Sequence, residues 1–368
     1  MTAYMKKFQF LFLLQLMFSL CLFGQNKLSG RIDSLFNSFI SQGEPGGAVL
    51  IAKNNNIIFS KGYGVADINT KETITPHTSF NLGSISKTFV SNAILILQQR
   101  QQLSVEDNMA KYFPDFKNKA IAQKVQIKHL LSHVSGLPDC REVSKNPVFY
   151  LTADDAQNFA PIQQTDTLVF QPGSKYEYSN PAFNGLALII EKVTGMKWQD
   201  FVKKEIFAKA GLKESDITDG SHPETGMSHG YEKDNNVYKE LDYGEEPTFC
   251  ASGNGGVWSS VSDLYKYYQA LMKPAFLNKE IISNSMQVKS FNSWSDTAKP
   301  FIGYSWFVTK TFDGQHRIGH TGSQGGFRTN FQFVPGKNTF VTMLFNTPQD
   351  VDVIMTKIEM ILKEEKYL

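Results

Sequence analysis

The sequence predicts an α/β protein in which strands near the two ends of the chain form one sheet. Apolar runs bounded by turn residues, typical of strands, lie at 48–52, 57–60, 304–308, 327–334 and 339–345. From about residue 103 to 290, helical segments alternate with loops rich in Pro, Gly, Asn and Asp. We therefore expect a sheet built from both termini, with a large helical insertion between its two halves.

The individual elements follow from apolar spacing and turn residues. Apolar side chains recur at helical spacing through residues 27–42, and a Gly-Gly pair then opens the first strand. Three consecutive asparagines at 54–56 make the turn into the second strand, which predicts a hairpin. The run 88–97 is apolar enough for a buried helix. Near the end, the sequence Pro-Gly-Lys-Asn separates the last two strands, and an amphipathic helix is expected from about 351 to 363.

Length and charge exclude some functional classes. At 368 residues, of which 41% are apolar, the chain can bury one large domain or two interleaved ones. The 37 basic and 35 acidic residues nearly balance, with a formal net charge of +2. This balance argues against nucleic acid or another polyanion as the main partner. We expect an ordinary folded, soluble protein.

Residues 1–25 have the pattern of a secretory signal peptide. Lys6 and Lys7 precede an apolar stretch, 8–23, that is followed by Gly-Gln-Asn. Export to the periplasm or the medium, with cleavage after residue 24 or 25, is the leading interpretation. An uncleaved membrane anchor and a buried helix remain as alternatives. Lipid attachment at Cys21 is a further one, although Leu20 stands where a lipoprotein signal needs a small residue.

The pair Ser84 and Lys87 is the first candidate for chemistry. At a spacing of three residues both side chains lie on one face of a helix. A serine hydroxyl needs a neighbour that takes its proton, and a lysine withdrawn from water can serve. Ser84 also stands at the start of the predicted helix, where free amides and the helix dipole favour negative charge. Alone, the pair is common enough to arise by chance.

Two further motifs supply what this pair lacks. Tyr178 has a hydroxyl that can act as a base beside a lysine, and Asn180 can project the same way from extended backbone to offer its amide to a substrate. His320, Gly322 and Ser323 lie in a glycine-rich segment where a ligand can approach the backbone closely. A backbone amide there can face that of Ser84 to form an oxyanion hole.

Each of these residues also has a structural interpretation. A lone tyrosine is usually an amphipathic core residue, and a lone histidine is usually structural. His129 and His133 have the spacing of a zinc pair on a helix, but no third ligand is evident. Three tyrosines at 265, 267 and 268 suggest either a carbohydrate-binding patch or helical core packing. Cys140 and Cys250 either pair or stay as thiols.

Taken together, the three motifs resemble those of a known family. Ser84-x-x-Lys87, Tyr178-x-Asn180 and His320-x-Gly322, in this order, are similar to the active-site motifs of the serine β-lactamase and penicillin-binding-protein superfamily. The likeness is greatest to its class C-related branch, which includes D-alanyl-D-alanine carboxypeptidases, D-aminopeptidases and esterases. Flanking segments also match the family, at 75–80, 130–137, 172–173 and 253–260.

The resemblance implies a role for each residue. Ser84 would be the acylated nucleophile, and Lys87 and Tyr178 would share the general-base role, without an assignment of which acts at each step. The amides of Ser84 and Ser323 would hold the oxyanion. Asn180 would contact the substrate amide, and His320, with Gly322 beside it, would line the pocket wall. Neither a metal nor a cofactor is implied.

The resemblance also implies the fold and the class of activity. We expect a β-lactamase/transpeptidase-like α/β fold: one domain, 26–368, with an antiparallel sheet flanked by helices from 26–82 and 291–368, and a helical part, 83–290. Family members that destroy β-lactams usually have lysine at the position of His320. The histidine therefore favours an ester or peptide-like amide as substrate over a β-lactam. A D-amino-acid peptidase, a β-lactamase and a silent peptidoglycan-binding sensor remain alternatives, and the oligomeric state is open.

Overall fold

The computed structural model describes residues 27–140, 152–219, 223, 225–241 and 250–368. The expected signal peptide, 1–25, therefore lies outside the described residues. Within the described ranges, no helix is long and apolar enough to cross a membrane. Cys140 and Cys250 are not joined in a disulfide.

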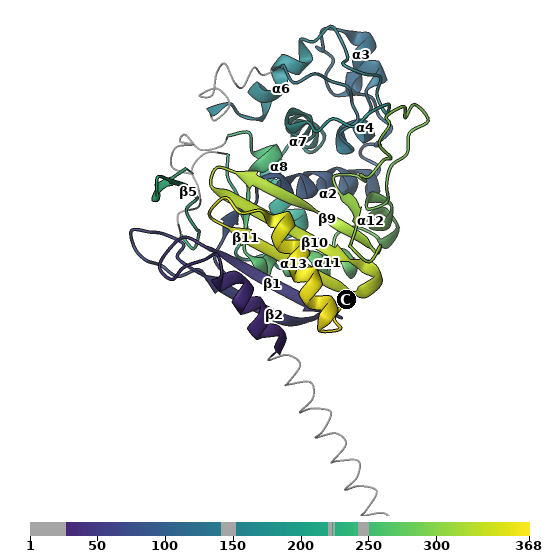
Figure 1. Ribbon diagram of the computed structural model, residues 1–368. Helices are drawn as coiled ribbons and strands as arrows, with labels where there is room; N and C mark the ends of the chain where they lie inside the picture. Colours follow the sequence, from purple (N-terminus) through teal and green to yellow (C-terminus); the bar gives the residue numbers. More distant parts are fainter. Residues whose placement is uncertain (1–26, 141–151, 220–222, 224, 242–249) are drawn as a thin grey trace, which may run out of the picture.

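The main sheet has six antiparallel strands that come from both ends of the chain. Their order is β2-β1-β11-β10-β9-β8. Figure 1 shows the purple strands β1 and β2 lying beside the yellow-green strands of the C-terminal end. Pairing of Gly47 with Phe345 and of Lys53 with Thr339 joins the two ends along the whole of β1. The strands are β1 (Gly47–Lys53), β2 (Asn56–Tyr63), β8 (Phe307–Lys310), β9 (His316–Gln324), β10 (Phe327–Val334) and β11 (Thr339–Phe345).

Helices cover both faces of this sheet (Figure 1). Residues 27–37, which are helical, and α13 (Val351–Glu364) pack on one face, over Val49 and Ile51. On the other face α2 (Ser86–Gln99) and α11 (Val261–Met272) pack over the alternate residues of the same strand, such as Leu50. Because successive side chains of a strand point to opposite faces, a strand buried on both faces reads as a continuous apolar run.

The middle of the chain is mainly helical, with short strands that the sequence did not predict. Three of these strands form a small sheet in the order β3-β7-β4, and β5 pairs with β6. Strands of two to four residues are too short to show a period of two. The further elements are β3 (Phe80–Asn81), β4 (Asp216–Ile217), β5 (Tyr231–Asp234), β6 (Val237–Glu240), β7 (Val257–Ser259), η1 (Gly83–Ile85), η2 (Met109–Lys111), α3 (Lys119–Lys124), α4 (Ile127–Leu131), α6 (Asp155–Gln163), α7 (Asn180–Thr194), α8 (Trp198–Val202), η3 (Lys203–Phe207), α9 (Ala208–Ala210), α10 (Ser252–Gly255), α12 (Lys279–Ser285) and η5 (Pro335–Lys337).

The predicted elements agree closely with this architecture at the two ends of the chain. The strands expected at 327–334 and 339–345 have those bounds, and the final helix runs one residue further than expected. The strand expected at 304–308 is wrong at its start, because Ser305 has a left-handed backbone (φ 64°) and pairing begins only at Phe307. The tyrosines at 265, 267 and 268 are all buried in the core, which excludes a surface patch.

Candidate active site

Ser84 lies in a tight turn that leads directly into the buried helix α2. The turn is the short 3₁₀ segment η1, and its first residue, Gly83, has a left-handed backbone (φ 51°) that a side chain would strain. The Asn81 side chain accepts a hydrogen bond from the Gly83 amide at 2.8 Å. Ser84 remains partly exposed while its neighbours are buried, so its hydroxyl is accessible to a substrate.

Lys87 is fully buried and contacts the candidate nucleophile directly. Its ammonium Nζ donates hydrogen bonds to Ser84 Oγ at 3.1 Å and to the Asn254 carbonyl at 2.6 Å. It also lies 5.1 Å from the ring centre of Tyr178 and 5.8 Å from that of Phe183. This arrangement places a proton-transfer group beside the serine hydroxyl, as the sequence spacing predicts.

Tyr178 stands over the lysine with its ring packed between two histidines. Tyr178 is 37% exposed, and its ring stacks on His133, with 4.3 Å between ring centres and 22° between planes. The ring centre of His320 lies 6.4 Å away on β9. Sequence reasoning placed His133 in a structural segment and missed this contact. The only signal in the sequence that could have pointed to His133 was its place in the segment 130–137, which matches the family.

Asn180 begins helix α7, and this differs from the expectation of extended backbone. Ser179 is the extended residue, and its hydroxyl caps the helix by accepting from the Ala182 amide at 3.3 Å. Proline at the next position, 181, suits the first turn of a helix. Asn180 is therefore a half-buried residue at the helix start, two positions after Tyr178.

Strand β9 brings its backbone against the serine turn because two glycines leave room. A Cβ on Gly322 would overlap the Leu82 carbonyl, which also accepts a hydrogen bond from the Thr329 hydroxyl at 2.8 Å. A Cβ on Gly83 would come within 2.8 Å of the Ser323 amide nitrogen. The backbones of Gly83 and Ser323 are therefore neighbours. This is the close approach that an oxyanion hole between the amides of Ser84 and Ser323 requires.

His320 is buried as a neutral imidazole. Its Nδ1 lies 2.6 Å from the Thr321 carbonyl, which accepts only, so Nδ1 carries the proton and Nε2 holds a lone pair. Burial, with a further contribution from the charge of Lys87, lowers the pKa of His320 to about 3. Nε2 has no hydrogen-bond partner among the described residues. The ring thus brings no positive charge to the site.

Behind Lys87, a chain of buried polar groups leads to a carboxyl group. Asn254, whose carbonyl binds Lys87, donates its side-chain amide to Asn184 Oδ1 at 3.1 Å. Asn184 in turn donates to Asp155 Oδ1 at 2.5 Å. Asp155 also accepts from the Gly253 amide at 2.9 Å, the Trp198 indole at 3.0 Å and the Ser252 hydroxyl at 3.4 Å. Burial raises the pKa of Asp155 to about 7, although its donors oppose the shift.

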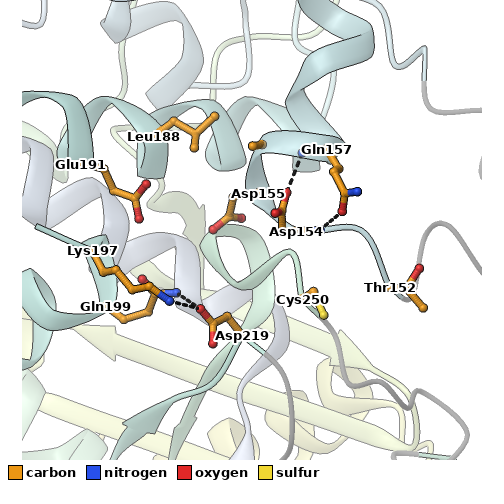
Figure 2. A pocket seen from close by; sticks show the side chains of 11 residues that line it. Thr152, Asp154, Asp155, Gln157, Leu188, Glu191, Lys197, Gln199, Asp219 and Cys250 are labelled. Atoms are coloured by element: carbon orange, nitrogen blue, oxygen red, sulfur yellow. Dashed lines mark hydrogen bonds and ion pairs between the residues drawn. The ribbon is translucent and has the colours of Figure 1, made fainter.

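A polar cavity of about 450 Å³ opens beside Asp155. Figure 2 shows Asp155 and Glu191 on its wall, with Lys197 and Gln199 bound to Asp219 across it. None of the predicted site residues lines this cavity. Large cavities often mark active sites, but here the candidate chemistry lies elsewhere, at Ser84.

The zinc alternative fits the structure poorly. Nδ1 of His129 accepts from the Gln126 amide at 3.1 Å, and Nδ1 of His133 accepts from the Ser179 amide at 3.0 Å. Both nitrogens are therefore engaged by backbone groups, and the left-handed conformation of His133 lies outside helix α4. The described residues contain no group of three His, Cys, Asp or Glu side chains that could hold a metal ion.

Comparison with known proteins supports the resemblance. Penicillin-binding protein 4* of Bacillus subtilis is 28% identical over 347 residues, which cover 89% of this chain and 74% of the relative. The octameric penicillin-binding protein homologue of Pyrococcus abyssi has a TM-score of 0.79 at 23% identity, covering 91% of this chain and 77% of the other. The D-amino acid amidase of Ochrobactrum anthropi, solved with D-phenylalanine, has a TM-score of 0.74 at 20% identity, covering 92% and 99%.

These likenesses confirm the β-lactamase/transpeptidase-like fold expected from the sequence. At a general level they support a hydrolase, since penicillin-binding proteins and amidases occur among the similar proteins. The family model described as beta-lactamase matches residues 27–362, nearly the whole described chain, and the protein therefore belongs to the beta-lactamase family.

Proposed function

We propose that this protein is a serine hydrolase that forms an acyl-enzyme on Ser84 and hydrolyses an ester or a peptide-like amide. The observation that carries the proposal is the 3.1 Å hydrogen bond between Lys87 Nζ and Ser84 Oγ, made under the ring of Tyr178. A nucleophile, a proton acceptor and a second acid-base group thus meet at one point of the structure.

In the proposed reaction the chain's own groups perform each step. Lys87 and Tyr178 share the removal of the Ser84 proton, and Oγ attacks the substrate carbonyl. The amides of Ser84 and Ser323 stabilise the negative charge that develops on the carbonyl oxygen. The proton passes to the leaving group, and the same bases then activate the water that releases the acyl group. Asn180 contacts the substrate amide.

The neutral state of His320 favours substrates without a carboxylate at this wall. A fixed positive charge here would bind a carboxylate, but burial keeps the imidazole uncharged with a pKa of about 3. Its Nε2 lone pair is the remaining acceptor of the ring, and it too is buried. We therefore infer an ester or an uncharged amide as the substrate, with slow acylation by penicillins.

A substrate panel tests the proposal. Wild type and Ser84→Ala are compared on a p-nitrophenyl ester, a D-amino acid amide, a D-Ala-D-Ala peptide and a chromogenic cephalosporin. Intact mass is recorded after treatment with a fluorophosphonate. We expect ester or amide turnover and one adduct on Ser84 in the wild type, and neither in Ser84→Ala. If the folded protein is neither labelled nor active, the hydrolase proposal fails and the alternative of a silent peptidoglycan-binding protein takes its place.

A D-amino-acid peptidase or amidase is the second candidate. It is favoured by the similarity to a D-amino acid amidase and to a penicillin-binding protein. In the panel, this candidate requires turnover of the D-amino acid amide or the D-Ala-D-Ala peptide in preference to the ester. A cephalosporin turned over faster than either would favour a β-lactamase.

We also propose that the protein is exported and that residues 26–368 work as one catalytic domain. The pattern of residues 1–25 supports export, and the pairing of β1 with β11 supports a single unit, because neither end of the chain completes the sheet alone. N-terminal sequencing of secreted protein tests export. Material that begins at Met1 would contradict a cleaved signal peptide.

A further inference from the structure

His133 is a fully buried histidine that packs directly against the candidate base. Its ring stacks on Tyr178 at 4.3 Å and also contacts Phe183, with 5.0 Å between ring centres. Tyr176 lies at the edge of the ring, 6.0 Å away. The imidazole therefore forms the inner wall on which the Tyr178 ring rests.

His133 also holds the backbone on both sides of Tyr178. Its carbonyl accepts a hydrogen bond from the Glu177 amide at 2.9 Å. Its ring Nδ1 accepts from the Ser179 amide at 3.0 Å. One residue thus fixes the peptide groups before and after the tyrosine and supports the ring between them, so it limits the positions that the phenol oxygen can reach.

These contacts require a neutral ring of one tautomer. Because Nδ1 accepts from Ser179, the single proton of the neutral imidazole is on Nε2. Burial lowers the pKa of His133 well below its usual value, and the charge of Lys87 and the nearby His320 lower it further. A second proton would remove the acceptor for Ser179 and place another positive charge near Lys87.

The backbone of His133 shows that this placement has a cost. Its φ of 55° is left-handed, a conformation that strains a non-glycine residue. His133 follows the end of α4. At this position the chain turns, and the His133 side chain faces the segment 176–179. Asparagine tolerates this conformation best among side chains with an acceptor, which makes it a suitable replacement.

We propose that His133 is a positioning residue for Tyr178, which it holds by ring stacking and by hydrogen bonds to the peptide groups on either side. It acts through the tyrosine and does not touch the substrate. The inference rests on the proposed hydrolase function, in which Tyr178 is a base. This role explains why a histidine occupies the strained position. The position requires both a flat ring and an acceptor nitrogen, and a purely structural residue would need neither.

The test compares three variants. His133→Asn keeps an acceptor but loses the stacked ring, whereas His133→Phe keeps a ring and loses the acceptor. His129→Asn is the matched control, because His129 is also buried and its Nδ1 also accepts from a backbone amide, that of Gln126, with no contact to Tyr178 among its described interactions. Thermal unfolding, kcat, KM and the pH profile of ester hydrolysis are measured for each, together with crystal structures.

We expect His133→Asn and His133→Phe to lower kcat roughly 10- to 100-fold, since misplacing a reacting group by about 1 Å can cost a factor of this size. KM should change less than kcat, and the basic limb of the pH profile should shift. In the crystal structures the Tyr178 ring should be displaced in both variants. His129→Asn should lose thermal stability while keeping kcat, the pH profile and the position of the ring.

The outcomes separate this inference from the proposed function. Active wild type with unchanged kcat and pH profile in both folded His133 variants would overturn the positioning role alone. A wild type that hydrolyses none of the substrates would overturn the proposed function, and the crystal structures would still decide the positioning role. A Tyr178 ring that is not displaced in either His133 variant would overturn the positioning role. Equal losses of kcat in His129→Asn would reduce His133 to a general structural residue.

Discussion

Two buried polar regions lie on either side of the short helix α10, and they differ in how the groups at their centres are paired. At Ser84, Nε2 of His133 and Nε2 of His320 are buried with no hydrogen-bond partner among the described residues. At Asp155, each carboxylate oxygen accepts two hydrogen bonds, from four separate donors. The cavity of about 450 Å³ lies at the second region.

The contacts of the two regions support different roles. In the first region Lys87 Nζ contacts Ser84 Oγ, and we propose the chemistry there. In the second region four donors share one carboxyl group, and Asn184 and Asn254 link it to the carbonyl that binds Lys87. We therefore propose that the Asp155 region supports Lys87.

The largest expected effect is the loss of activity in Lys87→Ala. Removal of the group that contacts Ser84 Oγ should lower kcat/KM about 10⁴-fold. Asp155→Asn, in the supporting region, should lower it by less than about tenfold. Steady-state kinetics on the best substrate of the panel measure both. Comparable losses would show that the two regions act as one catalytic unit and would break the distinction.

Asp155→Ala should have the largest effect on stability. It leaves four buried donors without an acceptor, which should cost about 3 kcal/mol of unfolding free energy. Asp154→Ala is the matched control, because the neighbouring carboxylate only caps α6 by accepting from the Gln157 amide, a contact worth about 1 kcal/mol. Urea denaturation measures both. Equal losses would mean that the buried carboxyl group gives no special support.

Gly322→Ala tests whether the reactive region depends on close approach of the backbone. The added methyl group would overlap the Leu82 carbonyl and force β9 away from the serine turn. A displacement of about 1 Å should lower kcat roughly 100-fold. Gly336→Ala, on the turn between β10 and β11, meets only the end of the Gln315 side chain at 3.5 Å and should leave kcat unchanged. Unaltered activity in Gly322→Ala would argue against an oxyanion hole at Ser323.

The contributions of the two regions to stability should also change in opposite directions as the pH falls. Burial lowers the pKa of His320 to about 3. An unfolded histidine takes up a proton below about pH 6.5, so the contribution of His320 to stability is lost as the pH falls below that value. Burial raises the pKa of Asp155 to about 7, so its contribution is present at low pH and lost as the pH rises toward 7.

The variant Asp155→Asn separates these opposing contributions to stability. Between pH 7 and pH 5, Asp155→Asn should lose about 2 kcal/mol more unfolding free energy than the wild type, because the gain from Asp155 is gone. Urea denaturation at the two pH values gives this difference. A variant that loses the same amount as the wild type would show that Asp155 does not change protonation in this range.

Much of the architecture was predictable because it follows local rules. The strands at 327–334 and 339–345 are apolar runs bounded by turn residues, and the last helix has clear amphipathic spacing. Ser84 and Lys87 meet because three residues make nearly one helical turn. The short strands β3, β4 and β7 were not predictable, because two or three residues carry no period.

The supporting residues were hidden from the sequence for a different reason. Asp155, Asn184 and Asn254 are far apart in the chain, and each alone is an ordinary polar residue. His133 lies 45 positions before Tyr178, and its role depends on a left-handed backbone that no sequence pattern required. Neither the pairing of these groups nor their burial has a local signature.

The sequence by itself predicted the strands at 327–334 and 339–345, the helix that follows Ser84 and carries Lys87, and membership of a family, because periodicity and short motifs are local properties of a chain. Only the tertiary structure decided that β9 touches the serine turn, that Tyr178 rests on His133, and that Asp155 supports Lys87 through two asparagines. These contacts arise when the core closes around distant segments, since burial then determines which polar groups find partners.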